Sequence, residues 1–249
     1  VGTNAGQASD TDTCYNIGIG YSAAYSLNSG DNNVMIGKQA GACLTSGQYN
    51  TFLGCYAGYN SNGSCNFFAV NGAGSDNETG LSNVFIGFGA GQGTGAATKD
   101  ASHNIAIGQG AGACLDSGDH NIFLGSQSGQ CTYLGTGCNI NIGWCAGKAN
   151  RTGIKNIIMG CRAASGSSNV VRDGSDNVIL GSKAGCMLST GDGNVFLGTC
   201  TGIAITTGGY NVGLGYSVGA CLWGGYHNIL LGNQVGKNLT SGSCNVVIG

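Results

Sequence analysis

The thirteen cysteines have the widest chemical choice in this chain, because a thiol can bind a metal, attack a substrate or form a disulfide. No C-x-x-C pair is present and no Cys/His cluster has the spacing of a zinc site, which favours disulfides. Cys131 and Cys138 flank one Gly turn, and Cys145 and Cys161 hold near-equivalent places in the sequence pattern. These four are the disulfide candidates, and their presence would indicate an oxidising, extracellular setting. The alternative is that small Cys side chains only fill buried space.

Acidic and His side chains offer little catalytic chemistry. Cleavage of a glycosidic bond needs two carboxylates facing one groove, but the eleven acidic residues lie mostly in turn segments, as Asp31 and Asp119 do. His103 and His120 occupy equivalent places in the repeat and could stack. One possible role for them is to bind a metal between chains. Tyr and Cys occupy the same place elsewhere, which favours a bulky packing position. We therefore expect no catalytic residue, no metal site and no cofactor, and the chain is predicted not to be an enzyme.

Four N-x-[ST] sequons mark possible glycosylation sites. About four such sequons are expected by chance at this Asn, Ser and Thr content, so the pattern alone is weak support. All four lie in segments expected to form loops: Asn62, Asn77, Asn150 and Asn238.

These residues belong to a short repeat, Asn-x-x-aliphatic-Gly. In it, an Asn is followed by any two residues, then usually by an aliphatic residue, and then by Gly. Nine of the thirteen spacings between these Asn residues are 17 residues, and the others are 16, 18, 21 and 21. A fixed period of this size is typical of a solenoid. The repeated residues are Asn16, Asn33, Asn50, Asn66, Asn83, Asn104, Asn121, Asn139, Asn156, Asn177, Asn194, Asn211, Asn228 and Asn245.

One coil can be described by counting the repeated Asn as position 0. Positions +1 and +3 are mostly β-branched or aliphatic, which predicts a short strand with one buried face. Gly at +4 ends the strand, and a second, weaker strand is expected near +10 to +12, as in Cys43-Leu44-Thr45. The chain is thus predicted to be an all-β solenoid of about fourteen 17-residue coils with two short parallel strands each. The Asn side chains should stack as an amide ladder that holds the turns.

Position +2 should point away from +1 and +3, and would be polar in a solitary solenoid. Instead it is apolar in ten of fourteen coils. An outward apolar stripe of this length predicts an oligomer interface with identical chains. The alternative is a wide coil that wraps around both sides of the strand. The proposed interface residues are Met35, Phe52, Phe68, Phe85, Phe123, Ile158, Ile179, Phe196, Leu230 and Val247.

The domain organisation predicted is one continuous repeat domain over residues 1–249, with four-coil blocks near 33–103, 104–176 and 177–244. The chain starts and stops with half a coil, at Val1-Gly2-Thr3-Asn4-Ala5-Gly6 and at Asn245-Val246-Val247-Ile248-Gly249. Either the chain is a piece of a longer protein, or its ends dock head to tail in a filament.

The composition argues against several kinds of binding partner and of protein. Only 8% of residues are charged and the formal net charge is −2, so no basic face is available to bind nucleic acid. No apolar run approaches the ~18 residues of a membrane span, so membrane insertion is not expected. Gly contributes 50 residues and Pro none, which excludes collagen.

The unit N-[VI]-F-[IL]-G-x-x-A-G resembles the repeats of tail-fibre-type proteins and, more loosely, the head repeats of trimeric autotransporter adhesins. The resemblance covers essentially the whole chain and implies a left-handed β-roll, parallel trimers and an extracellular shaft or attachment role. The high Cys content departs from such repeats. The membrane anchor and the self-cleaving chaperone segment of those families are not carried over.

These observations favour an extracellular structural fibre or filament subunit that associates with itself, on a secreted, cell-surface or virion-surface structure. A receptor- or glycan-binding adhesin segment is the alternative, with insertion loops such as residues 98–102 carrying recognition. A polysaccharide-cleaving tail spike is a third interpretation.

Overall fold

The computed structural model describes residues 1–7, 13–93, 99–131, 137–166 and 173–249, and its strands confirm the predicted β-solenoid. Fourteen parallel strands of three residues each belong to one sheet, in chain order. They are β1 (Ile17–Ile19), β2 (Val34–Ile36), β3 (Thr51–Leu53), β4 (Phe67–Ala69), β5 (Val84–Ile86), β6 (Ile105–Ile107), β7 (Ile122–Leu124), β8 (Ile140–Ile142), β9 (Ile157–Met159), β10 (Val178–Leu180), β11 (Val195–Leu197), β12 (Val212–Leu214), β13 (Ile229–Leu231) and β14 (Val246–Ile248).

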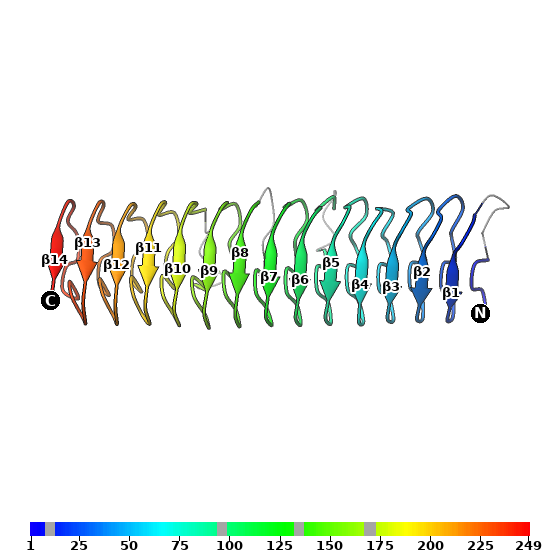
Figure 1. The fold of residues 1–249 in the computed structure, drawn as a ribbon, viewed down its shortest axis with the longest axis horizontal. Coiled ribbons are helices and arrows are strands. Elements are labelled where there is room, and N and C mark those ends of the chain that lie inside the picture. The colour runs from blue at the N-terminus through cyan, green and yellow to red at the C-terminus, as the bar shows by residue number, and fades with distance from the viewer. Residues whose placement is uncertain (8–12, 94–98, 132–136, 167–172) are drawn as a thin grey trace. The chain divides into compact units, whose positions relative to one another are not determined.

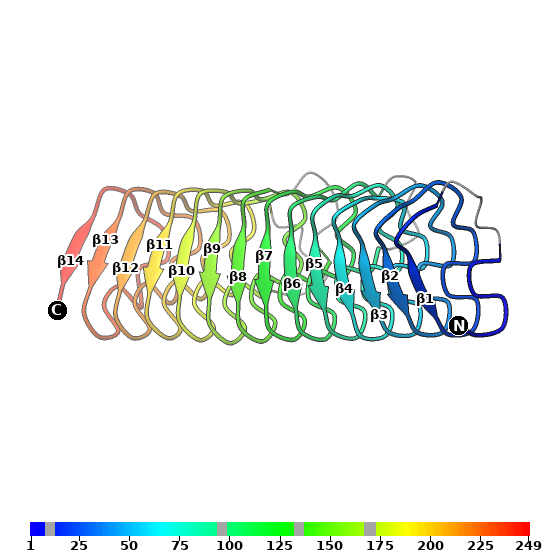
Figure 2. The same ribbon diagram turned by 45° about the vertical axis from the view of Figure 1, so that its right-hand side comes forward.

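Contacts divide the chain into two compact units, which we call unit 1 (Val1–Phe123) and unit 2 (Leu124–Gly249). Within unit 1, β1 to β6 lie side by side, and within unit 2, β8 to β14 do so (Figure 1, Figure 2). The pairing keeps the repeat in phase, so that Val34 pairs with Thr51 and Ile36 with Leu53. Equivalent positions of successive coils therefore form straight rows along each unit.

Each strand covers positions +1 to +3 of its coil, as the sequence predicts, but the expected second strand is not formed in the described residues. Cys43-Leu44-Thr45 lies in turn and irregular structure. Its backbone still bonds to the next coil, since Cys43 N donates to Tyr59 O at 2.9 Å. Hydrogen bonds between coils thus continue past the strand, but the turn at Gly41 and the bend at Thr45 and Ser46 leave too few extended residues for a strand.

The core lies between the strand and the return segment of the coil. Position +2 of the strand meets small residues at +7, such as Ala57 and Ala73, and apolar residues at +11, such as Leu44. Phe52, Phe68 and Phe85 stack in successive coils, with ring centroids 5.1 and 5.0 Å apart and interplanar angles of 8° and 5°. The aromatic ladder of unit 1 is therefore internal.

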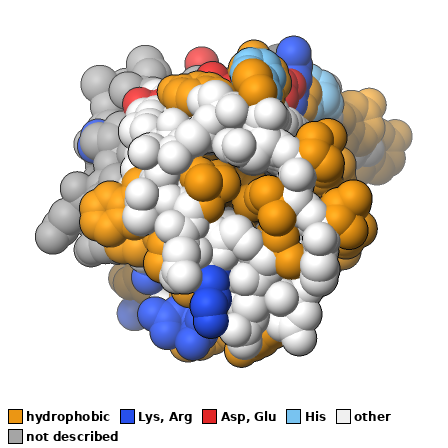
Figure 3. Space-filling model, turned by 90° about the vertical axis from the view of Figure 1, so that its left-hand side faces the viewer, with side chains coloured by type: hydrophobic (Ala, Val, Ile, Leu, Met, Phe, Trp, Pro, Cys, Tyr) orange, Lys and Arg blue, Asp and Glu red, His pale blue; other side chains and the backbone are white. Residues whose placement is uncertain are grey.

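The expectation that position +2 faces outward is wrong. Nine of the ten residues assigned to an oligomer interface are at most 4% exposed, because the coil closes behind that face of the strand: Met35, Phe52, Phe68, Phe85, Phe123, Ile158, Ile179, Phe196 and Leu230. The tenth, Val247, is 38% exposed, since β14 is the last strand of the sheet and has one neighbour only. Apolar side chains are visible at that end of unit 2 (Figure 3). We call position +2 the inner row.

Gly at +4 is required by two constraints at once. Gly181 has φ +141°, a conformation that L side chains rarely adopt. A Cβ there would lie within 2.4 Å of Gly198 O, the equivalent residue of the next coil. The coils therefore approach too closely for any side chain at this turn.

Candidate interaction surface

The repeated Asn residues form a hydrogen-bonded ladder inside each unit. Asn50 shows the pattern: its backbone N and its Nδ2 both donate to Asn33 Oδ1, at 2.9 and 3.1 Å. Its Nδ2 also donates to Gly63 O at 2.9 Å, which fixes the turn before the next strand. The Asn50 side chain is fully buried. This geometry positions the strands and leaves the amide no room for a substrate.

The cysteines do not form the expected bridges. All thirteen lie in the described part of the chain, and none forms a disulfide there. Cys145 occupies position +6, is buried and donates to Gln127 Oε1 at 3.3 Å, whereas Cys161 occupies +5 and is exposed. Because neighbouring positions in a turn direct their side chains differently, near-equivalence in sequence does not bring the two sulfurs together. Cys131 at +10 and Cys138 at −1, which flank one Gly turn, do not form a disulfide either.

The two equivalent His side chains do stack. The rings of His103 and His120 lie 4.9 Å apart at an interplanar angle of 5°. Tyr210 and His227 stack in the same place in unit 2, at 5.3 Å. Among the described residues no group of three or more His, Cys, Asp or Glu could hold a metal ion. We therefore interpret position −1, where these rings lie, as a packing position on the surface.

The four sequons differ in access. Asn77 and Asn150 are 4% and 5% exposed, and the Nδ2 of Asn150 donates to Gly153 O at 2.9 Å. A glycan cannot be attached to these two in the folded chain. Asn62 and Asn238 are exposed and remain the candidates. In the expected recognition loop at 98–102, residue 98 lies outside the described residues and Lys99 is buried.

The outward face of the sheet is a continuous surface of each unit. Positions +1 and +3, which we call the outer rows, were expected to face the core but are partly or largely exposed in every strand. In unit 1 Ile17, Ile36 and Ile107 are 49%, 38% and 39% exposed. In unit 2 all fourteen outer-row residues from β8 to β14 are apolar: Ile140, Ile142, Ile157, Met159, Val178, Leu180, Val195, Leu197, Val212, Leu214, Ile229, Leu231, Val246 and Ile248.

The apolar area of this face is comparable to the area that one partner buries in a protein interface. At roughly 60 Å² for each residue, the outer rows of unit 2 expose about 800 Å², the area that one partner gives to a standard interface. A contiguous apolar patch larger than a few hundred Å² on a water-soluble protein marks an interaction site. No outer-row position carries a charge, and Thr51 is the one residue there that is not apolar. The face is apolar and uncharged, as the inner face of a packed pair of sheets is.

Sequence reasoning placed these rows on the wrong side of the strand. The signal that could have found them is the small residue at +7 and the Gly at +8, which must lie where space is tight. A Cβ on Gly58, at +8, would come within 2.6 Å of the Phe52 ring. Small residues at +7 and +8 therefore pack against +2, and +1 and +3 are left outside.

Comparison with known proteins gives no match: no protein-family model, curated protein or solved structure is similar to this chain. No helix in the described ranges is long and apolar enough to cross a membrane.

Proposed function

We propose that the chain is a non-enzymatic structural subunit of an extracellular fibre or filament, and that its solenoid units associate laterally with further copies of the chain. The observation that carries this proposal is the pair of apolar outer rows on the sheet. Water contact with about 800 Å² of apolar side chains is unfavourable, and at ~25 cal/mol per Å² its burial favours association. A second copy offers the same apolar, uncharged face and is the simplest cover for it.

The repeat supports a structural role. Its conserved features within the chain are the Asn ladder, the Gly turns and the inner row, all of which are used to stack coils. The resemblance to tail-fibre-type repeats implies a trimer, and three sheet faces turned toward one axis would bury the outer rows completely. An extracellular location and a trimeric state are parts of the proposal.

The test is the oligomeric state of a variant with charges in the outer rows. Ile157→Lys with Met159→Lys places two charges on β9, where the native side chains are 38% and 39% exposed. We expect wild-type protein to sediment as an oligomer and the double variant to sediment as a monomer with an unchanged far-UV circular dichroism spectrum, although the loss of association lowers its melting temperature. The control is Met187→Lys, which charges an apolar side chain that is 54% exposed but lies outside the sheet.

Two results would contradict the proposal. One is wild-type protein that remains monomeric at about 100 µM, where a standard interface is expected to be occupied. The other is an oligomer that Met187→Lys dissociates as effectively as the β9 double variant does. Negative-stain imaging of wild-type protein adds a direct view, since long unbranched assemblies are expected.

A further inference from the structure

Unit 1 carries a surface notch of about 280 Å³ that the structural role leaves unexplained. Its lining comes from three successive coils, those that begin at Asn50, Asn66 and Asn83. The side chains that border it include Tyr56, Tyr59, Asn71, Asp76, Phe88 and Gln92. Two aromatic walls thus enclose a polar floor.

The notch exists because side chains are missing at one position of the repeat. Position +6 has a left-handed backbone in all thirteen coils that contain it. It carries a side chain in ten of them and is Gly in three consecutive coils, at Gly72, Gly89 and Gly110. A Cβ on Gly72 would meet only Gly89 N, at 4.0 Å, so space above it is open. Since Gln39 at the same position has φ 56°, the backbone conformation does not require Gly here.

Aromatic side chains stand at both sides of this gap. Phe88 is 60% exposed and Tyr56 is 37% exposed. Tyr59 packs against Tyr56 with ring centroids 5.6 Å apart at 62°, which holds the Tyr56 ring in place. Exposed rings with fixed orientation offer apolar faces to a ligand at low entropy cost.

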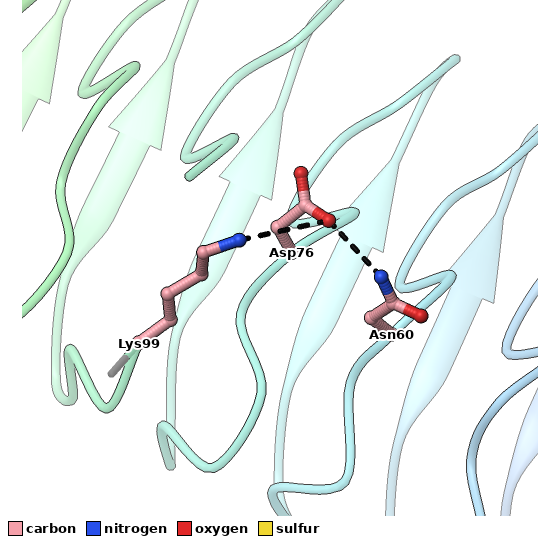
Figure 4. Close-up of polar contacts among 3 residues, drawn as sticks. All are labelled: Asn60, Asp76 and Lys99. Carbon is pink, nitrogen blue, oxygen red and sulfur yellow. Dashed lines mark hydrogen bonds and ion pairs between the residues drawn. The ribbon is translucent and has the colours of Figure 1, made fainter. Parts of the chain in front are cut away.

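The polar floor is built around Asp76. Its Oδ1 accepts from Asn60 Nδ2 at 3.1 Å and forms an ion pair with Lys99 Nζ at 3.8 Å (Figure 4). The other carboxylate oxygen points away from both partners (Figure 4). The Lys99 side chain is 6% exposed and the Asp76 side chain 26%, so the cation is held beneath the acid.

The notch as a whole is close to neutral. Lys99 offsets the charge of Asp76, and Asn71 and Gln92 are uncharged amides. The pKa of Tyr59 is raised, first by electrostatic interaction with Cys43, then by its hydrogen bond to that thiol, by burial and by Tyr56, so its phenol stays protonated. The floor itself therefore carries no uncompensated charge; the nearby Lys38 ammonium lies over the Tyr56 ring, 5.7 Å from its centroid.

We propose that this notch binds one hexose unit of a glycan. A hexose has an apolar C–H face, which fits against Tyr56 and Phe88, and hydroxyls that can bond to Asp76, Asn71 and Gln92. It is uncharged, as the floor requires, and its size suits the 280 Å³ of the notch. The inference goes beyond the structural role, because a fibre that only spaces other parts needs no such site.

The test is saturation-transfer-difference NMR of the whole chain with four probes: the methyl glycosides of glucose, mannose, galactose and N-acetylglucosamine, each at about 10 mM, which detects millimolar binding. We expect transfer to the ring C–H protons of at least one probe. Phe88→Ala should lower the affinity about tenfold, because one aromatic wall is lost.

A filling variant separates binding from folding. Gly72→Gln places an amide in the notch in the backbone conformation that Gln39, Gln127 and Gln234 adopt at φ 56°, 55° and 57°. It should abolish transfer while the melting temperature and the sedimentation of the oligomer stay at wild-type values. Tyr216→Ala, which removes an aromatic side chain 54% exposed in unit 2, is the matched control and should bind as wild type does.

The proposal is overturned if none of the four probes shows transfer, if Gly72→Gln binds as well as wild type, or if Tyr216→Ala loses the signal too. Because the readout is probe binding and not association, its failure leaves the lateral-association result untouched, and the reverse also holds.

Discussion

Phe67 and Phe68 are adjacent residues of β4, identical in type, and they lie in opposite environments. Phe67 belongs to an outer row and is 37% exposed, whereas Phe68 belongs to the inner row and is fully buried between Phe52 and Phe85. The side chains of the inner row form the core of the coil. Those of the outer rows are apolar too, but they are partly or largely exposed. One strand thus carries two apolar stripes, of which one is enclosed in the core and the other lies at the surface.

The largest expected effect breaks the inner row. Phe68→Ala should lower the free energy of unfolding by about 3–5 kcal/mol, because it removes a ring from the middle of a stacked core and leaves a cavity. Phe67→Ala, its neighbour, should cost less than about 1 kcal/mol. Urea unfolding followed by circular dichroism measures both, and equal losses would mean that the two rows are not distinct in energy.

The separation of the rows also depends on the turn that follows the strand. Gly181→Ala should lower the free energy of unfolding by about 2–3 kcal/mol, since φ is +141° and the new Cβ would meet Gly198 O at 2.4 Å. Gly224→Ala is the control, because its Cβ would meet only Thr207 Oγ1 at an ordinary 3.4 Å. Thermal unfolding should place the control near wild type; a Gly181→Ala protein of wild-type stability would show that the coils can move apart.

The smallest expected effect is a repair of the inner row. Asn141 occupies position +2 and is fully buried, and neither amide atom has a hydrogen-bond partner among the described residues. Asn141→Leu should raise the free energy of unfolding by about 1–2 kcal/mol, because an unsatisfied amide is replaced by an apolar side chain of similar shape.

Its matched control lies two residues earlier, in the amide ladder. Asn139 Nδ2 donates to Gly153 O at 3.0 Å, and Asn139 Oδ1 accepts from Asn156 N, also at 3.0 Å. Asn139→Leu should therefore destabilise the chain by about 2 kcal/mol or more. If both substitutions shift urea midpoints in the same direction, the polarity of Asn141 serves a purpose that its contacts do not reveal.

The repeat predicted much of the fold because each coil repeats the same local demands. The amide ladder follows from the Asn period, and each of the fourteen strands lies at +1 to +3, where the β-branched residues are. The Gly at +4 ends the strand, as expected, and the structure adds the close approach of the next coil as a second reason. Cysteine pairing failed because it depends on side-chain direction within a turn, which near-equivalent places such as +5 and +6 do not share.

The sequence by itself determined the period, the strand positions and the residues that stack from coil to coil, since these depend on local spacing. Only the tertiary structure decided which side of the strand is enclosed. Both faces of the strand are apolar, so either could form the core until the rest of the coil packs against one of them. It also decided that each coil has one strand in the part of the chain that the structure describes, and that the missing side chains of Gly72 and Gly89 at +6 open a notch beside Tyr56 and Phe88. Both depend on what the next coil places opposite each residue, which no single repeat contains.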